Sequence, residues 1–553
     1  MIYSQKELSQ LIIESCVAYD IEHVIISPGS RNAPLTIGFT NCIEIKTYSI
    51  VDERCAAFFG LGIAQQTQKP VALVCTSGSA LLNYYPAFAE AFYSNIPLLV
   101  ISADRPKELI DIGDGQTIRQ ENVFQNHSIF NANLIHGKAN EVENEKLISK
   151  AIQLAILRNG PTHINVPFDE PLYETCNMAS IKKVEPIVLP KSKEFDSNLH
   201  DFIKHWNLSD KKIILIGANY PNQLLQQQLD QLVIDPSVLV FTETTSNLHN
   251  LKFINGIDKL IFSLDDGDFE RLKPDILITL GGMIVSKKIK QFLRKYQPEH
   301  HWHLSNDRCL DTFHCLSQYF ECDPTVFFSH FLDLVTPVES DYQNYWLGNK
   351  ENSAKKQKIF SDTAEFSDFQ VFDIVLYSLP NTIQLQLSNS SVIRYVQLFE
   401  SNPSIKVFCN RGTSGIDGST STAIGAASVT SVQTVFITGD ISFFYDSNAL
   451  WNTYMPKNFR IIVINNGGGG IFKILPEPKN TNALDYFETR HNLSAEYLCK
   501  MHQVDYRKAS MKQELVHELN SFFDECENPK LLEIFTPNEI NDQVLKNYFN
   551  AIK

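Results

Sequence analysis

The sequence predicts an α/β protein made of three doubly wound parallel-sheet domains. The chain has 553 residues, and short β-branched runs recur along it, each followed by a Gly/Ser/Pro-rich loop and a longer helical stretch. A chain of this length is too long to fold around a single hydrophobic core. Continuous apolar strands that alternate with helices are typical of parallel sheets covered on both faces. The predicted strands span residues 23–27, 71–75, 97–102, 163–166, 212–216, 238–242, 275–280, 406–409, 434–438 and 460–464.

Two polar stretches, residues 177–199 and 335–370, are predicted to be linkers. The first contains prolines and lysines, and the second is rich in Lys, Gln, Asn and Ser. They divide the chain into three predicted domains of similar size, at residues 1–180, 195–340 and 365–553.

The composition indicates a cytoplasmic protein that binds neither nucleic acid nor membranes. The formal net charge of −15 disfavours non-specific nucleic-acid binding. No apolar run reaches the roughly 20 residues that span a bilayer, and the polar N-terminus lacks the features of a signal peptide. The 11 cysteines are scattered without paired spacing, so we expect reduced thiols rather than disulfides or structural zinc.

The strongest motif lies in the third predicted domain. One predicted strand ends in Gly439-Asp440, and the next is followed by Asn465-Asn466 and four glycines, residues 467–470. A carboxylate, an amide oxygen and a backbone carbonyl are oxygen ligands that suit Mg²⁺, and glycines allow a diphosphate to approach the backbone closely. The alternative is a pair of ordinary turns, which four consecutive glycines disfavour because unused glycine costs folding entropy.

Loops after other predicted strands contain arginines. Arg31 and Arg105 lie in Gly/Pro-constrained loops of the first predicted domain, and Arg394 and Arg411 lie in small-residue loops of the third. Forked guanidinium groups suit planar carboxylates, although each arginine alone could equally form a structural ion pair. Glu53 opens an apolar helical stretch, where an acid is also favoured simply by the helix dipole.

The middle predicted domain offers one comparable loop. Residues 281–286, Gly-Gly-Met-Ile-Val-Ser, follow a predicted strand and lead into Lys287 and Lys288. A ligand-binding pair of lysines and a solvated pair are equally good interpretations of this pattern.

Together these motifs resemble those of thiamine-diphosphate enzymes, and within that superfamily the menaquinone-pathway synthases that join 2-oxoglutarate to isochorismate. The resemblance covers most of the chain, and the motifs come in the expected order. It rests on residues 27–31, 52–54, 76–78, 103–106, 116–118, 410–418, 439–443 and 465–472.

The resemblance implies a role for individual residues. Glu53 corresponds to the glutamate that hydrogen-bonds the cofactor's pyrimidine ring, and Glu53 and Gln116 are the expected catalytic residues. Asp440, Asn466 and Gly468 are the expected ligands of Mg²⁺, with Mn²⁺ as the alternative ion. The expected cofactor-binding residues are Pro28, Glu53, Thr76, Gly78, Ser414, Gly415, Ile416, Asp440, Ile441, Ser442, Asn466, Gly468, Ile471 and Phe472. The expected substrate-binding residues are Ser30, Arg31, Arg105, Gln116, Lys287, Lys288, Ser390, Arg394 and Arg411.

The resemblance also implies the reaction and the assembly. The expected activity is that of a transferase of the transketolase class, which decarboxylates 2-oxoglutarate and adds the remaining fragment to isochorismate. Residues 1–180 would bind the pyrimidine and residues 365–553 the diphosphate and metal. The active site would lie between the subunits of a homodimer or of a dimer of dimers.

Three alternatives are open. Another thiamine-diphosphate 2-oxoacid decarboxylase or carboligase, such as an acetohydroxyacid synthase, would handle smaller or less charged acceptors and need fewer loop arginines. A non-catalytic relative would lose Glu53, Asp440 or Asn466, and all three are present. A nicotinamide dehydrogenase would carry a G-x-G-x-x-G turn with an acid about 20 residues further on, which the sequence lacks.

Overall fold

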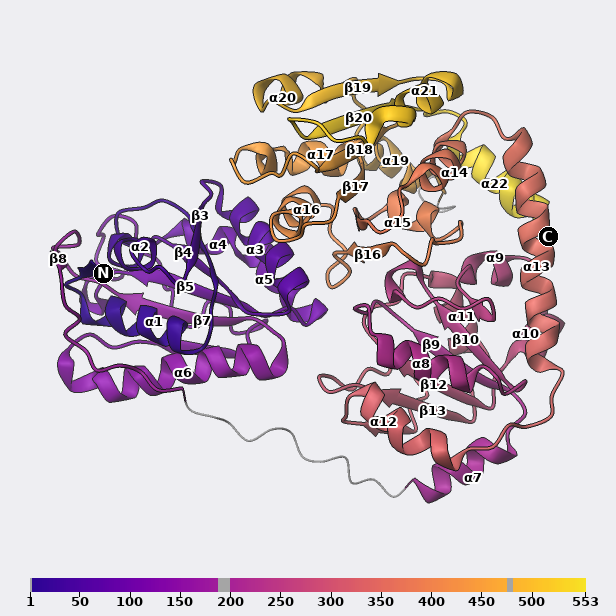
Figure 1. Ribbon diagram of the computed structural model, residues 1–553, viewed down its shortest axis with the longest axis horizontal. Coiled ribbons are helices and arrows are strands. Elements are labelled where there is room, and N and C mark those ends of the chain that lie inside the picture. Colours follow the sequence, from indigo (N-terminus) through magenta and orange to yellow (C-terminus); the bar gives the residue numbers. More distant parts are fainter. Residues whose placement is uncertain (1, 187–198, 475–480) are drawn as a thin grey trace.

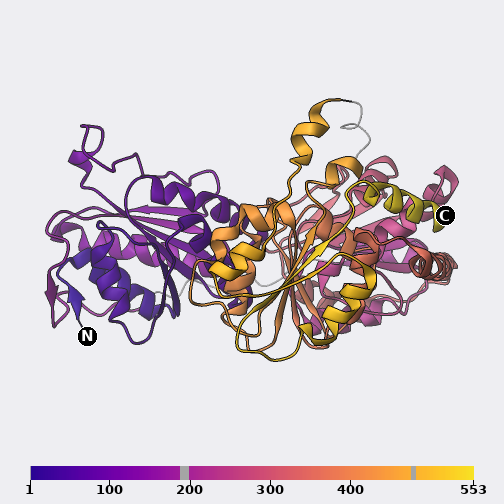
Figure 2. The same ribbon diagram turned by 90° about the horizontal axis from the view of Figure 1, so that it is seen from above.

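The computed structural model describes residues 2–186, 199–474 and 481–553. Three six-stranded sheets, each wholly parallel and flanked by helices, follow one another along the chain. Figures 1 and 2 show the first and third sheets side by side, with the middle sheet next to the third. The predicted α/β class with three parallel-sheet units is confirmed.

The first sheet lies between two layers of helices. A short antiparallel pair, β1 (Tyr3–Ser4) and β8 (Thr175–Cys176), lies beside it. In spatial order the strands are β3 (Lys46–Ser49), β2 (His23–Ile26), β4 (Val71–Cys75), β5 (Leu98–Asp104), β7 (Thr162–Pro167) and β6 (Phe130–Asn133). The helices are α1 (Glu7–Ala18), α2 (Ala33–Thr40), α3 (Glu53–Thr67), α4 (Ser79–Asn83), α5 (Tyr85–Ser94), η1 (Lys107–Leu109), η2 (Lys138–Asn140) and α6 (Glu141–Arg158).

The middle sheet is followed by a long helix, α13 (Tyr342–Thr363), that leads to the third sheet. Its strands in spatial order are β11 (Phe253–Ile254), β10 (Val238–Thr242), β9 (Lys212–Ile216), β12 (Ile276–Leu280), β13 (His300–Leu304) and β14 (Gln318–Phe320). Its helices are α7 (His200–Leu208), α8 (Gln223–Leu232), η3 (Thr244–Ser246), α9 (Ile257–Phe262), α10 (Asp266–Leu272), α11 (Lys287–Lys295), α12 (Pro324–Phe331) and η4 (Leu332–Leu334).

The third sheet occupies the C-terminal part of the chain. Its strands in spatial order are β16 (Lys406–Cys409), β15 (Gln384–Leu387), β17 (Thr434–Gly439), β18 (Arg460–Asn465), β20 (Lys530–Phe535) and β19 (Asp505–Ala509). Its helices are α14 (Asp368–Ser378), α15 (Ser391–Val396), α16 (Ser419–Ala427), α17 (Asp440–Tyr445), η5 (Ser447–Leu450), α18 (Ile471–Ile474), α19 (Ala483–Glu488), α20 (Glu496–Met501), α21 (Lys512–Phe522) and α22 (Asn541–Ala551).

The order of the strands places a switch point in each sheet, where successive connections leave in opposite directions. It falls between β2 and β4 in the first sheet, between β9 and β12 in the middle sheet and between β15 and β17 in the third. Ligands of open α/β sheets bind outside the carboxyl ends of the strands at such points. The motif loops at residues 27–31, 76–78 and 439–443 lie at these positions.

One hydrophobic core joins the first sheet to the third. Helix α3 packs along α16, and a single cluster of buried side chains runs from Ile25 and Leu73 through Phe58 and Phe59 to Phe436. The opposite face of the first sheet has a core of its own beneath α1, α2 and α6. Figure 1 shows α3 and α16 next to each other at this junction.

Glycines permit the close approach of these two helices. A Cβ atom at Gly62 would lie 2.0 Å from the carbonyl oxygen of Thr422, and one at Gly425 would lie 2.0 Å from that of Phe59. A side chain at either position would therefore separate the helices, which makes the two glycines part of the contact between the sheets.

The predicted linker at 335–370 is mostly helical instead of irregular. Helix α13 occupies most of it, and helix α14 begins at its end. Its Lys, Gln and Glu residues are good helix formers, and Tyr342 and Trp346 are buried on one side of α13. Much of the other predicted linker, 177–199, lies outside the described residues, as does the predicted start of the middle domain at 195. The domain boundaries stay predictions.

Candidate active site

Asp440 and Asn466 meet at the carboxyl edge of the third sheet. Asp440 follows β17, Asn466 follows the neighbouring β18, and both side chains are buried. The Asp440 carboxylate accepts hydrogen bonds from Ile441 N at 2.7 Å and Gly468 N at 3.0 Å, and His491 Nε2 lies 3.3 Å away. The structure therefore brings the acid and the amide of the predicted metal motif together with the glycine run.

The Asn466 side chain has one buried atom without a partner. Asn466 Nδ2 donates to Asp368 Oδ2 at 2.9 Å, and Asn538 Nδ2 donates to the Asn466 carbonyl oxygen at 2.7 Å. Asn466 Oδ1 is buried and has no hydrogen-bond partner. A buried oxygen left unpaired costs about 1–3 kcal/mol, so a cation at this point would satisfy it.

A metal here would depend on few protein ligands. Among residues 2–186, 199–474 and 481–553, no group of three or more His, Cys, Asp or Glu side chains could hold a metal ion. Mg²⁺ usually takes one or two carboxylates and obtains its other oxygens from phosphate and water. One carboxylate, one amide oxygen and a backbone carbonyl therefore fit a metal–diphosphate group.

The glycine run after β18 needs glycine at specific positions. Gly467 and Gly468 have φ values of 74° and 155°, and a Cβ atom at Gly468 would lie 2.6 Å from the carbonyl oxygen of Glu488. Other residues would be strained or would clash there. Phe472, just beyond the run, contacts the ring of Phe487, so an apolar wall borders this edge.

The predicted cofactor residues on the neighbouring loops surround the same edge. Ser442 Oγ donates to the carbonyl oxygen of Ile416 at 2.7 Å, and the Gly415 carbonyl accepts from Asn389 Nδ2 at 2.8 Å. Ser414 is exposed with φ of 61°. Ile441 and Ile471 are partly buried next to these loops.

Glu53 is the first residue of α3, whose N-terminal residues contact the third sheet's α17 segment. Asp52 caps the helix and accepts from Asn448 Nδ2 at 2.8 Å, while Arg54 Nη2 donates to the Tyr445 carbonyl at 3.0 Å. Both residues that flank Glu53 thus contact the segment that begins with Asp440. The head of α3, which carries the predicted catalytic glutamate, is therefore anchored to the end of α17 and to η5 of the third sheet.

Arg411 is buried and only partly hydrogen-bonded. Its Nη1 donates to Asn389 Oδ1 at 2.7 Å, whereas its Nε is buried without a partner. The Glu90 carboxylate of α5 holds the same loop by accepting from Gly412 N at 2.7 Å and Thr413 N at 2.6 Å. A buried guanidinium with a free donor on a fixed loop is suited to binding a carboxylate.

Arg394 lies in the last turn of the third sheet's α15, near Arg411. Burial, and next the positive charge of Arg411, lower the pKa of Arg394. Its Nη1 donates to the carbonyl oxygen of Ser390, the predicted substrate-binding serine, at 2.5 Å. Two guanidinium groups that repel each other are stabilised by an anion that binds both of them.

The first sheet's switch point carries another buried arginine. Arg31 Nη1 donates to the Phe168 carbonyl at 2.8 Å, its Nη2 lies 3.1 Å from Glu170, and its Nε is buried without a partner. Thr76 Oγ1 accepts from Arg31 N at 3.3 Å. Pro28 and Ser30, in the same loop, are exposed. Arg31 thus has a structural ion pair and a free donor.

Arg105 and Gln116 lie together on an outer loop of the first sheet. Arg105 Nε donates to the Gly115 carbonyl at 2.9 Å, and Asp114 lies 3.6 Å away. Gln116 is exposed with φ of 56°. A Cβ atom at Gly78 would lie 3.4 Å from the carbonyl oxygen of Gln116, so this loop reaches the predicted cofactor loop.

A buried polar network beneath these loops was not apparent from the sequence. Gln120 Oε1 accepts from Gly78 N at 2.8 Å, and Gln120 Nε2 donates to Asn165 Oδ1 at 2.9 Å. Asn165 Nδ2 donates in turn to Asp104 Oδ2 at 2.8 Å. Burial raises the pKa of Asp104 to about 6, which the hydrogen bond from Asn165 opposes. The network ties the Gly78 loop to the residue before Arg105, although no local motif marks it.

Lys287 and Lys288 open α11 beside the middle sheet's switch point. Lys287 is exposed, and Lys288 Nζ lies 4.5 Å from the ring centre of Phe262. The turn before them contacts Glu243, a buried residue that the sequence analysis missed: Val285 N and Ser286 N both donate to its carboxylate. The Glu243 carboxylate also interacts with the charge of Arg411, so the lysine helix lies near the arginine loop.

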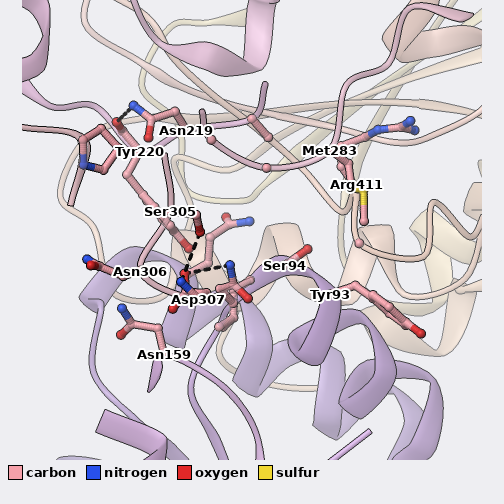
Figure 3. Close-up of a pocket in the computed structure, with 18 of the residues that line it drawn as sticks. Tyr93, Ser94, Asn159, Asn219, Tyr220, Met283, Ser305, Asn306, Asp307 and Arg411 are labelled. Atoms are coloured by element: carbon pink, nitrogen blue, oxygen red, sulfur yellow. Dashed lines mark hydrogen bonds between the residues drawn. The ribbon is translucent and has the colours of Figure 1, made fainter. Parts of the chain in front are cut away.

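A cavity of about 1090 Å³ opens at the middle sheet's switch point, and Arg411 also lines it. Figure 3 shows Arg411 and Met283 close together on one side, with Asn219 and Tyr220 further along the wall. The Arg411 loop therefore borders both this cavity and the carboxyl edge of the third sheet.

Comparison with known proteins agrees with this geometry. The thiamine pyrophosphate enzyme N-terminal TPP binding domain matches residues 6–130. The 2-succinyl-5-enolpyruvyl-6-hydroxy-3-cyclohexene-1-carboxylate synthases of Flavobacterium psychrophilum and Flavobacterium johnsoniae are each 56% identical to this chain, over the whole length of both chains. The synthase of Cytophaga hutchinsonii is 37% identical over 98% of each chain.

The described helices include none that is both long and apolar enough to cross a membrane. The carboxylate–amide edge, the glutamate-headed helix and the buried arginines are the features that the sequence predicted for one family. Given relatives this similar over its full length, the chain belongs to the 2-succinyl-5-enolpyruvyl-6-hydroxy-3-cyclohexene-1-carboxylate synthase family of thiamine-diphosphate-dependent enzymes.

Proposed function

We propose that this protein decarboxylates 2-oxoglutarate and adds the remaining four-carbon fragment to isochorismate, releasing CO₂ in menaquinone biosynthesis. The product would be the compound for which its relatives are named. The observation that carries the proposal is the edge of the third sheet, where the buried Asp440 carboxylate and the unpaired Asn466 Oδ1 lie beside the glycine run. An acetohydroxyacid synthase is disfavoured by the names of the relatives and by the number of arginines in the loops.

Asp440, Asn466 and the Gly468 carbonyl would hold Mg²⁺, or Mn²⁺ as the alternative. The unpaired Asn466 Oδ1 and the buried Asp440 carboxylate support this assignment. Thiamine diphosphate, when bound, supplies the carbanion chemistry that removes CO₂ from a 2-oxo acid and transfers the rest. The residues proposed to cradle it are Pro28, Thr76, Gly78, Ser414, Gly415, Ile416, Ile441, Ser442, Ile471 and Phe472.

Glu53 would hydrogen-bond a ring nitrogen of the pyrimidine and exchange a proton with it. Its position at the head of α3 supports this role, because its carboxylate interacts with Cys75, the last residue of β4, next to the proposed cofactor loop at Thr76 and Gly78. Gln116 would act on the acceptor side from the outer loop that reaches Gly78.

We assign some of the basic side chains to 2-oxoglutarate and the others to isochorismate. Arg394 and Arg411, with Ser390, would bind 2-oxoglutarate, since the partly buried Arg394 and the buried Arg411 lie close enough to interact with each other. The proposed contacts of isochorismate are Ser30, Arg31, Arg105, Gln116, Lys287 and Lys288. Two dianionic substrates in a protein of net charge −15 require such a local concentration of positive charge.

Assembly and location complete the proposal. We place residues 1–180, 195–340 and 365–553 as the pyrimidine-binding, central and diphosphate-binding domains of a cytoplasmic homodimer or dimer of dimers with active sites between subunits. The support is the family to which the chain belongs. Light scattering of the purified protein would measure the number of subunits.

Product analysis tests the reaction. Purified protein is given thiamine diphosphate, Mg²⁺, 2-oxoglutarate and isochorismate, and products are followed by mass spectrometry, with Glu53→Gln as the variant and pyruvate as the competing donor. We expect a decarboxylated adduct from 2-oxoglutarate only, and a loss of at least about 100-fold in Glu53→Gln because general acid–base catalysis contributes that much. Preference for pyruvate, or full activity of the variant, would refute the proposal.

A further inference from the structure

Helix α11 begins with a charge pattern that opposes its own stability. Lys287 and Lys288 are its first two residues, and the N-terminus of a helix carries partial positive charge that favours acids there instead. A sequence that breaks a local rule without a local gain often does so at a functional position. The compensation must then come from outside the helix.

Two carboxylates, one buried and one partly buried, supply that compensation. Glu243, which is 2% exposed, follows β10, and Asp258 lies in α9. Ser286 caps α11 by accepting from Ile289 N at 3.1 Å, and its hydroxyl donates to Asp258. Negative charges thus lie behind the N-terminus of α11, where they offset both the dipole and the lysines.

Glu243 holds the turn that precedes the lysines. Val285 N lies 2.9 Å from Glu243 Oε1 and 2.7 Å from Oε2, and Ser286 N donates to Oε1 at 2.8 Å. Burial raises the pKa of Glu243 to about 7, while these amide groups and then Arg411 oppose the rise. The Glu243 carboxyl group therefore fixes the backbone of the turn through hydrogen bonds from two consecutive amide groups.

Charged groups from three elements face Glu243. Arg411 approaches from the third sheet, Lys290 from α11 and Asp258 from α9. Lys287 forms no salt bridge within the described residues, which leaves its charge available to a ligand. The carboxylate therefore lies between the helix that carries the lysines and the loop that carries the arginine.

We propose that Glu243 is a positioning residue that fixes the turn carrying Lys287 and Lys288 beside the Arg411 loop and thereby sets the affinity for the dianionic acceptor. The inference rests on the proposed function, because it assigns the lysines to isochorismate. The proposed role of Glu243 concerns the addition to isochorismate, which is the second half of the reaction. The groups that we assign to decarboxylation form no hydrogen bond with the Glu243 carboxylate in the described residues.

A second buried carboxylate in the same sheet provides a matched control. Asp235 accepts from Ser237 N at 2.9 Å and Val338 N at 3.2 Å and pairs with Lys212 at 3.0 Å, at the opposite, amino edge of the strands. Asp235→Asn removes a comparable buried charge far from the lysines. It should therefore reproduce any general loss of stability but no specific loss of acceptor affinity.

The test measures the two half-reactions of the holoenzyme separately. In Glu243→Gln the new amide NH₂ faces the Val285 N–H group, and the negative charge is lost. We expect the KM for isochorismate to rise about tenfold or more, since a mispaired buried group costs about 1.4 kcal/mol or more. Release of CO₂ from 2-oxoglutarate, followed with ferricyanide as electron acceptor, should change by less than about twofold, and Asp235→Asn should change neither.

Hydrogen exchange of residues 281–290 in the unliganded protein is the second measurement. We expect faster exchange in Glu243→Gln, near wild-type exchange in Asp235→Asn and partial recovery in Glu243→Asp. An unchanged KM, an equal rise in Asp235→Asn, equal losses in both half-reactions or unchanged exchange would each overturn the inference. If the wild type releases no CO₂ from 2-oxoglutarate, the proposed function fails instead, and the exchange result still decides whether Glu243 fixes the turn.

Discussion

The first and third sheets place their strands in one order, and the middle sheet places them in another. Numbered along the chain within each sheet, the first and third read 2-1-3-4-6-5, whereas the middle reads 3-2-1-4-5-6. The first and third meet helix against helix through α3 and α16. The middle sheet meets its neighbours through mixed contacts, which include hydrogen bonds such as Arg308 to Asn95 at 2.7 Å and Asn247 to Val407 at 2.9 Å and the stacked rings of Phe262 and Phe549.

The difference in strand order and in contacts between the sheets matches two different tasks in the proposed reaction. The matched sheets are joined by a tight apolar contact, which suits our proposal that they hold the reacting groups, because reacting groups must be positioned closely. In the same proposal the middle sheet contributes a loop with lysines, which would act through charge. We therefore expect substitutions in the third-sheet edge to abolish function, and those at the polar contacts to alter it.

The largest effect is expected at the carboxylate of the third-sheet edge. Asp440→Ala should weaken binding of thiamine diphosphate with Mg²⁺ by about 1,000-fold, because loss of one partner from a buried charged contact costs up to about 4 kcal/mol or more. Isothermal titration calorimetry measures the affinity, with the exposed Asp485→Ala as control. An affinity within about threefold of wild type would remove Asp440 from the cofactor site.

A smaller effect is expected at the buried arginine. Arg411→Ala should lower kcat/KM for 2-oxoglutarate, because it should remove about 2–4 kcal/mol of the free energy with which the protein binds the transition state. The affinity for the cofactor should stay near that of the wild type. Steady-state kinetics of CO₂ release checks this, and the exposed Arg119→Ala of the first sheet serves as control. Unchanged kinetics would show that the guanidinium does not bind the donor.

The smallest effect concerns the contact between the matched sheets. Gly425→Ala inserts a methyl group against the Phe59 carbonyl and should destabilise the protein by about 1–3 kcal/mol. Gly348→Ala, in α13 with open space around it, should instead stabilise by about 0.5–1 kcal/mol. Urea unfolding compares the two variants, and equal effects of the same sign would contradict a tight α3–α16 contact.

The strand pattern was largely predictable from the sequence, because each of the ten predicted strands overlaps an observed one. The missed strands lack a continuous β-branched run. β13 reads His-His-Trp-His-Leu, and its buried His301 and His303 each have one ring nitrogen 2.9 Å from Thr279 Oγ1. Such a strand is stabilised by a partner on another strand, which local pattern does not reveal.

The residues of the site likewise divide into those that the local sequence pattern predicts and those that it does not. Asp440 and Asn466 were predictable because two neighbouring strands carry them to one edge. Asp368, which orients the Asn466 amide, is 98 residues away in sequence, and Glu243 is 42 residues from the turn that it holds. These buried carboxylates follow no spacing rule, since their partners are backbone and side-chain groups that only the folded chain brings near.

The Asn247 contact has a further consequence for the solubility of the folded chain. β16 is the outermost strand of the third sheet, and a free strand edge is a template on which another polypeptide can add and start aggregation. The Asn247 amide donates to the Val407 carbonyl at 2.9 Å and accepts from Val407 N at 2.7 Å, as an added strand would. The Asn247 side chain thus occupies the backbone hydrogen-bonding groups of Val407 with which an added strand would pair.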